Sequence, residues 1–212
     1  PMTDLFEKGL KAFLAVANVI KEVRHGRILQ ISTRPTDFWT MMVNEGELLE
    51  RFGVQIFPIA MSDFTDRVKN LEEQDHDPEV AETVNYIKNT MEVCVTGDIV
   101  RRVAALKVAI KRYAQENGCN AVAIQCWDAL QNALHIMPCC ANAMLTDEGL
   151  PVVCETDIHG AITAIMAQAA GMGKTPSFFV DWSVRHPENE NGELLQHCGP
   201  WPLSLAIEKP KL

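Results

Sequence analysis

The stretch that decides the fold is PVVCETDIHGAITAIMAQAAGMGKTPSFFVDW, residues 151–182. A short apolar run at 151–154 is followed by a helical pattern of small residues over 157–170 and by a second apolar run at 177–180. Continuous apolar runs of this length are typical of strands that are buried on both faces of a sheet. Because a strand, a helix and a second strand form the crossover unit of a parallel sheet, this stretch predicts an α/β fold.

The same alternation extends toward the N-terminus. Apolar runs predict three further strands, and residues at helical spacing predict the helices between them. We therefore expect an α/β fold in which a parallel sheet of five strands is covered by helices on both faces. The three strands are expected at 27–32, 54–59 and 120–125, and the helices at 3–24, 41–52, 61–92 with a break near 77–78, 98–117 and 138–148.

Composition limits the classes of function. The 212 residues, 47% of them hydrophobic, suffice for one sizeable core, and the net charge is −9. Such an acidic chain lacks the basic surface that nucleic acids and anionic lipids attract, and no apolar run is long enough to span a bilayer. Seven cysteines, an odd number, favour reduced thiols and a cytoplasmic protein over a disulfide scaffold.

Polar and aromatic side chains follow the last three predicted strands. In parallel α/β sheets, ligands bind beyond the carboxyl ends of the strands, so these side chains are expected to meet in one pocket. The sequence therefore predicts a pocket lined by carboxylates and tryptophans. Its candidates are Gln125, Trp127 and Asp128 after the third strand, Glu155 and Asp157 after the fourth, and Asp181 and Trp182 after the fifth.

Two of these carboxylates indicate a metal site. Glu155 and Asp181 are one helix-plus-strand crossover apart, so they would converge if their strands are neighbours. Two carboxylates with room for an imidazole suit a hard cation such as Mn²⁺ or Mg²⁺. Asp157 alone is better explained as the cap of the helix that follows it.

One histidine, His197, lies in the stretch Gln-His-Cys-Gly-Pro-Trp-Pro, residues 196–202. Glycine and two prolines make this stretch an ordered turn, on which an imidazole can be a metal ligand. Packing of the ring by Trp201 explains the same residue equally well. Trp127, similarly, is either a residue of the predicted pocket or part of the core.

Taken in order, these segments resemble the L-arabinose and L-fucose isomerases over about residues 25–205. Residues 152–157 resemble the Glu-x-Asp segment of both enzymes, and residues 178–182 resemble the strand that brings the second metal carboxylate. His197 falls where arabinose isomerases carry a metal histidine. The pairs Cys126-Trp127 and His197-Cys198-Gly199 look most like a shorter branch related to fucose isomerase.

This resemblance implies a metal-dependent aldose–ketose isomerase that moves protons through a cis-enediol. Residues 1–175 would form a Rossmann-like middle domain, and 176–212 would begin a truncated C-terminal domain, so we expect a fragment with little activity alone. The intact protein would be a homo-oligomer, a trimer or hexamer, acting on a small sugar. The implied roles are Glu155 and Asp181 as catalytic carboxylates and metal ligands, His197 as a further ligand, and Gln125, Trp127, Asp157 and Trp182 as sugar-binding residues.

Two other classes of function compete with the isomerase. A non-catalytic sugar- or metabolite-binding α/β module would keep the strand-end tryptophans and need no metal. A metal-dependent hydrolase or aldolase would use the same carboxylates, but the chain has no paired-histidine motif with which to build a zinc or binuclear site.

Overall fold

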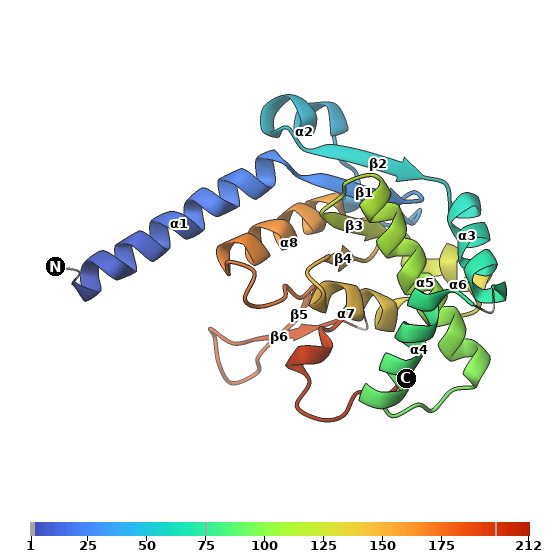
Figure 1. Ribbon diagram of the computed structural model, residues 1–212. Coiled ribbons are helices and arrows are strands. Elements are labelled where there is room, and N and C mark those ends of the chain that lie inside the picture. Colours follow the sequence, from blue (N-terminus) through green and yellow to red (C-terminus); the bar gives the residue numbers. More distant parts are fainter. Residues whose placement is uncertain (1–2, 75, 198) are drawn as a thin grey trace.

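The computed structural model describes residues 3–74, 76–197 and 199–212, and a parallel sheet forms its centre (Figure 1). Its strands are β1 (Arg27–Ile31), β2 (Gln55–Ile59), β3 (Ala121–Ile124) and β4 (Val152–Val153). They lie in the order β2-β1-β3-β4, and every pair is parallel. The predicted α/β class is therefore confirmed, and the first four predicted strands are all present.

Helices cover both faces of the sheet, because successive side chains of a strand point to opposite sides. Leu29 and Ile31 belong to one hydrophobic core, whereas Ile28, which precedes Leu29, belongs to the other, against which the α2 helix (Glu45–Phe52) packs. The larger core is covered by α3 (Met61–Glu73), α4 (Pro78–Thr90), α5 (Gly97–Glu116) and α7 (Cys139–Asp147), and the smaller one by α8 (Ile158–Ala170).

The first helix, α1 (Asp4–Arg24), is capped by Thr3 and contains no buried residue. Its C-terminal part packs against α8, where Asn18 Nδ2 donates a hydrogen bond of 2.9 Å to the carbonyl of Ala169. The N-terminal half projects away from the body of the molecule (Figure 1). Leu5 and Phe13 are 83% and 69% exposed there.

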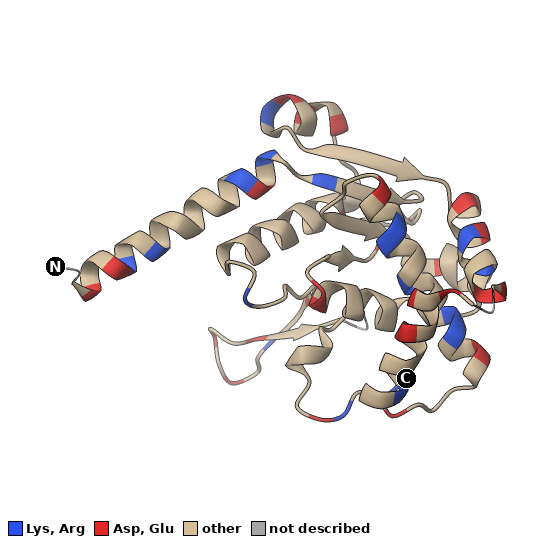
Figure 2. Cartoon of the chain, in the orientation of Figure 1, with Lys and Arg blue, Asp and Glu red and all other residues tan. Residues whose placement is uncertain are grey.

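The predicted break near 77–78 separates α3 from α4. Asp77 caps α4 by accepting hydrogen bonds from the N–H groups of Glu79 and Val80 at 3.1 and 3.2 Å, and it also pairs with Arg112. Burial would raise the pKa of Asp77, but the hydrogen bonds from Arg112 and the two amides outweigh it and lower the pKa. Figure 2 shows acidic and basic residues interspersed over α3, α4 and α5.

The predicted fifth strand is wrong: residues 177–180 are extended but pair with no strand of the sheet. Phe179 packs instead against the smaller core and against the ring of His197. Phe179 of this apolar run is therefore covered by α8 and by the imidazole of His197, and not by pairing with another strand. Asp181, expected at the end of that strand, begins a separate antiparallel hairpin of β5 (Asp181–Arg185) and β6 (Glu193–Gln196).

After the hairpin the chain returns to the main body. A short turn, η3 (Leu203–Leu205), contacts α7, where the N–H of Ser204 donates to Asp147 Oδ2 at 3.0 Å. Residues 210–212 then bond to residues 92–94. The division into domains at 175 stays a prediction. No helix of the described residues combines the length and apolarity needed to cross a membrane.

Candidate functional site

The carboxyl ends of β1, β3 and β4 are joined into one edge by hydrogen bonds. Gln125 donates from its N–H to the carbonyl of Ile31 at 3.0 Å, and its Oε1 accepts from Ser32 Oγ at 2.7 Å. On the other side of β3, the N–H of Thr156 donates to the carbonyl of Ile124 at 3.1 Å. Of the three strand ends that were predicted to converge, those of β3 and β4 lie together, and the loop after β1, which the prediction did not include, joins them. Gln125, proposed from sequence as a sugar-binding residue, is one of the groups that hold the loops together.

This edge stores backbone strain. Glu155 and Thr156 have φ of 54° and 57°, and Ser32 has φ of 69°, a left-handed region that side chains other than glycine seldom adopt. Each such residue costs on the order of 1–3 kcal/mol and persists only where the surroundings hold it. Thr156 is held by its hydroxyl, which donates to the carbonyl of Thr33 at 3.0 Å. Strain of this kind is concentrated at functional sites, which favours the loop after β4 as one.

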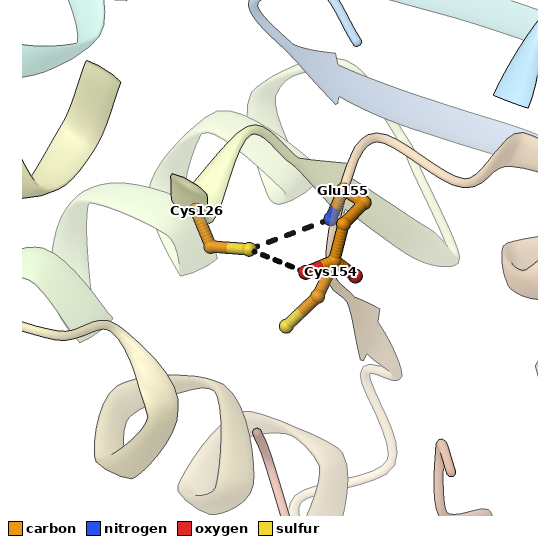
Figure 3. A group of neighbouring side chains, drawn as sticks. All are labelled: Cys126, Cys154 and Glu155. Carbon is orange, nitrogen blue, oxygen red and sulfur yellow. Dashed lines mark hydrogen bonds between the residues drawn. The ribbon is translucent and has the colours of Figure 1, made fainter. Parts of the chain in front are cut away.

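The strained loop places Glu155 against two cysteines (Figure 3). Cys126 Sγ donates to Glu155 Oε1 at 3.3 Å and accepts from the Glu155 N–H at 3.4 Å. Cys126 opens the wide helical turn η2 (Cys126–Leu130), and Cys154 directly follows β4. One carboxylate oxygen and the two sulfurs all lie within 4.8 Å of one another. Both cysteines are buried free thiols, and sequence reasoning missed their contact with Glu155.

The ionisation of this group is far from ordinary. Burial raises the pKa of Glu155 to about 8; negative charge on Cys126 and Asp181 acts in the same direction, and His197 opposes it. The hydrogen bond to Cys126 and burial raise the pKa of Cys154, so that thiol stays protonated. Glu155 is consequently a carboxyl group that can take up or release a proton near neutral pH, as a general base or acid must.

His197 is buried beside Glu155. Its Nε2 lies 3.9 Å from Glu155 Oε2, and its ring meets Phe179 edge-on at 5.2 Å between centroids. The sequence hypothesis of a ring packed by Trp201 is not what the structure shows: Phe179 packs against the ring, and Trp201 Nε1 donates to the carbonyl of His197 at 2.7 Å. The imidazole Nδ1 is buried and has no hydrogen-bond partner among the described residues. Cys198, part of the sequence signature, lies outside the described residues.

Asp181 is less closely placed than the sequence predicted. It is exposed at the start of β5, and its negative charge contributes to the raised pKa of Glu155. Within the described residues, the group of three or more candidate ligands that lies within 4.8 Å consists of Cys126, Cys154 and Glu155, and neither Asp181 nor His197 is in it. His197 therefore lies next to Glu155, whereas Asp181 lies on the exposed hairpin outside the group.

Asp157 caps α8, as its position suggested: its Oδ1 accepts from the Gly160 N–H at 2.9 Å. The same residue lines a cavity of about 410 Å³ between α8 and the extended segment 177–180. No other predicted site residue lines that cavity. This cavity beside α8 is therefore distinct from the carboxylate and thiol group.

The strand-end tryptophans are surface residues rather than core. Trp127 is 54% exposed and Trp182 is 77% exposed, which argues against the core interpretation of Trp127. The ring centroid of Trp127 lies 6.2 Å from that of Phe38, a residue of the loop after β1. That loop also carries Arg34, whose guanidinium lies 4.8 Å from the ring centroid of Trp39. Sequence reasoning missed this aromatic and cationic loop, although it too follows a predicted strand.

Comparison with known proteins adds an independent line of evidence. No family model matches the chain. A sulfoquinovose isomerase from Alkalicoccus urumqiensis is 29% identical over 202 residues, which are 95% of this chain and 44% of the relative. The chain is similar to sulfoquinovose isomerases.

Two further sulfoquinovose isomerases support the same relationship. One from Priestia megaterium is 27% identical over 206 residues, 97% of this chain and 45% of the relative. One from a Clostridium strain is 27% identical over 200 residues, 93% of this chain and 43% of the relative. The chain thus spans less than half the length of these relatives. Their name agrees with the sugar-isomerase part of the predicted resemblance and not with its fucose or arabinose part.

Proposed function

We propose that this chain carries part of the active site of an aldose–ketose isomerase that acts on sulfoquinovose or a closely related sugar. The observation that carries the proposal is Glu155, a buried carboxyl group with a pKa near 8, held on strained backbone where three strands end. General acid–base chemistry requires such a group, and the similarity to sulfoquinovose isomerases supplies the substrate class.

A hard divalent cation, Mn²⁺ or Mg²⁺, fits the residues present. Among the described residues no Lys or Arg pairs with Glu155, and the buried Nδ1 of His197 lacks a partner. Glu155, His197 and Asp181 would hold the ion. When bound, it would polarise the sugar carbonyl and acidify the neighbouring hydroxyl group.

Conversion of an aldose to a ketose requires two proton movements, from C2 to C1 and from O2 to O1. Glu155, as the carboxylate, accepts the proton from C2 and leaves a cis-enediolate. The proton of O2 passes to O1, and Glu155 or Asp181 returns the carbon-bound proton to C1.

The remaining strand-end residues would bind and orient the sugar. Trp127 and Trp182 expose their rings beside the site and can stack on the apolar face of a sugar. Gln125 and Asp157 would contribute hydrogen bonds to hydroxyl groups, in addition to the structural bonds that each makes.

The test is Glu155→Gln in the protein that contains this chain. Turnover of sulfoquinovose to its ketose, followed by NMR with Mn²⁺ present, is expected to fall by about 1,000-fold or more, because the variant cannot accept the C2 proton. Binding of Mn²⁺ to the chain, followed by electron paramagnetic resonance, should weaken in parallel. Glu47→Gln, which removes an exposed carboxylate paired with Arg51, is the matched control and should change neither. Full turnover by Glu155→Gln would refute the proposal.

The exposed tryptophans favour a second candidate function, that of a sugar-binding module without catalytic activity. The double variant Glu155→Gln/Asp181→Asn separates the two functions. A binding module would retain its sugar affinity in this variant and would show no metal-dependent isomerisation in the wild type.

A further inference from the structure

Two thiols border the same carboxylate that the proposed function assigns to a hard cation. The sulfurs of Cys126 and Cys154 and an oxygen of Glu155 lie within 4.8 Å of one another (Figure 3). Cys126 and Cys154 are 7% and 2% exposed, so they face the protein interior and not bulk water. The group comes from two different strand ends, and the hydrogen bonds between Cys126 and Glu155 hold them in register.

A fourth candidate ligand, His197, lies beside this group but is not itself within 4.8 Å of every member. The imidazole of His197 turns Nε2 toward Glu155, at 3.9 Å from its Oε2. At the other edge of the ring, a Cβ at Gly199 would lie 2.3 Å from His197 Nδ1 and 3.3 Å from Cys154 Sγ. The unpartnered Nδ1 and the sulfur of Cys154 therefore border one small space, which stays open because residue 199 is glycine.

This set of ligands does not match a hard cation. Two sulfurs, one imidazole and one carboxylate are the ligands that Zn²⁺ and its heavier relative Cd²⁺ prefer, in tetrahedral geometry. With metal–ligand distances of about 2.0–2.3 Å, the ligands of a tetrahedral zinc site lie roughly 3.3–3.8 Å apart. The contacts of Glu155 with Cys126 at 3.3 Å and with His197 at 3.9 Å are close to this spacing before any adjustment.

We propose that Cys126, Cys154, Glu155 and His197 form a binding site for a thiophilic divalent cation, Zn²⁺ or Cd²⁺. Binding replaces the thiol proton of Cys154, and any proton on Cys126 or Glu155, by bonds to the metal, and the protons pass to solvent. No electron is transferred. A second consequence rests on the proposed function: because Glu155 and His197 are shared, a thiophilic ion here excludes Mn²⁺ and removes the general base, so it inhibits the isomerase.

The direct test is a titration of the metal-free purified chain with Cd²⁺. Binding of one ion per chain is expected, with the ultraviolet charge-transfer absorption of cadmium–thiolate bonds. In Cys126→Ser/Cys154→Ser the absorption should be lost and the affinity should fall by about 100-fold or more, because serine does not replace a thiolate ligand. Cys126→Ala/Cys154→Ala repeats the test with apolar residues in case serine disturbs the buried site, and circular dichroism verifies the fold of each variant.

A matched control uses cysteines outside the group. Cys119 precedes β3, at the opposite end of the strand from Cys126, and Cys94 lies on the connection between α4 and α5. Cys94→Ser/Cys119→Ser should bind Cd²⁺ as the wild type does. The proposal is overturned if the wild type binds no Cd²⁺, or if this control loses the ion while both cluster variants keep it. In the latter case the two cluster thiols are only inert core residues.

Titration with Mn²⁺ distinguishes failure of this proposal from failure of the proposed function. Cys126→Ser/Cys154→Ser should keep Mn²⁺ affinity and lose Cd²⁺ affinity, whereas Glu155→Gln should weaken both. Wild type that binds Cd²⁺ but not Mn²⁺ would support the thiophilic site and count against the hard-cation isomerase. Wild type that binds Mn²⁺ but not Cd²⁺ would do the reverse. Added Cd²⁺ should release bound Mn²⁺, seen as the spectrum of the free ion.

Discussion

Glu155 combines burial, backbone strain and the absence of a Lys or Arg partner among the described residues. Each of these features destabilises the fold, and residues of this kind are kept where they serve binding or catalysis. The same loop contains Thr156, whose left-handed backbone and hydrogen bond to Thr33 support the position of the carboxylate. At the scale of single residues, the site is therefore built at the expense of stability.

This cost can be measured as a dependence of stability on pH. The pKa of Glu155 rises from 4.5 to about 8 on folding, mainly through burial. Its contribution to stability is then fully present below the unfolded value and is lost as pH rises from about 4.5 to 8. Thermal unfolding of the metal-free chain should show Glu155→Gln more stable than wild type at pH 8 and little different at pH 5. An equal difference at both pH values would contradict the assignment.

For the substrate class proposed above, Arg34 is the residue that we expect to recognise the sulfonate group. It lies in the loop after β1, over Trp39, and one of its terminal nitrogens is bound to the carbonyls of Pro35 and Thr36. A planar guanidinium can bind a tetrahedral oxyanion through two parallel hydrogen bonds. Arg34→Met should weaken sulfoquinovose binding by about tenfold or more in calorimetry, a loss of roughly 1.4 kcal/mol. Arg51→Met on the surface of α2 should have no effect.

Among the elements, α8 determines how the segment after it packs. Gly160 lies in its first turn, and Phe179 of the extended segment 177–180 rests against it. A Cβ at this position would lie 2.7 Å from Phe179 Cε2 and 2.6 Å from Asp157 Oδ2. The close contact explains why an apolar run that resembles a strand lies against a helix instead.

Gly160→Ala tests this packing. The added methyl group should destabilise the chain by about 1–3 kcal/mol in urea unfolding, because Phe179 and the capping side chain of Asp157 must both move. Gly9→Ala is the control: it lies in α1 with open space around its Cβ, and alanine there should stabilise the helix by about 0.5–1 kcal/mol. Equal changes in the free energy of unfolding at the two positions would mean that the contact of Gly160 with Phe179 does not contribute to stability.

Across the whole molecule, stability is concentrated in the two cores on either side of the sheet. The N-terminal half of α1 lies outside both, whereas Val23 near its end packs against the smaller core (Figure 1). Apolar side chains on a protein surface add little to the free energy of unfolding. The exposed apolar residues in the N-terminal half of α1 therefore add little to the stability of the described fold, and that stability does not explain why they are apolar.

Polar substitutions should affect stability differently in the exposed N-terminal half of α1 and at its packed C-terminal end. Leu5→Ser/Phe13→Ser should change the free energy of unfolding by less than about 0.5 kcal/mol, since neither side chain is buried. Val23→Ser should cost clearly more, because it removes packing from a core. Denaturant unfolding of the monomeric chain at low concentration is the measurement. A large loss from the double variant would show that α1 is packed against something in solution.

The local sequence alone determined the four strands, most helices and the break at 77–78, because hydrophobic periodicity and capping residues act over a few positions. It also determined that Gln125, Glu155 and Asp157 stand at strand ends. The hairpin at 181–196 lay beyond such reasoning, since its strands are exposed on every residue and show no burial pattern.

Only the tertiary structure decided which side chains meet at the site. Cys126 and Glu155 are 29 residues apart, and their contact depends on β3 and β4 pairing in one register. The position of His197 depends on a turn that packs against Phe179 after the sheet has ended. Sequence periodicity reports which side of an element is buried, but not which neighbour buries it, and the chemistry of this site is set by the neighbours.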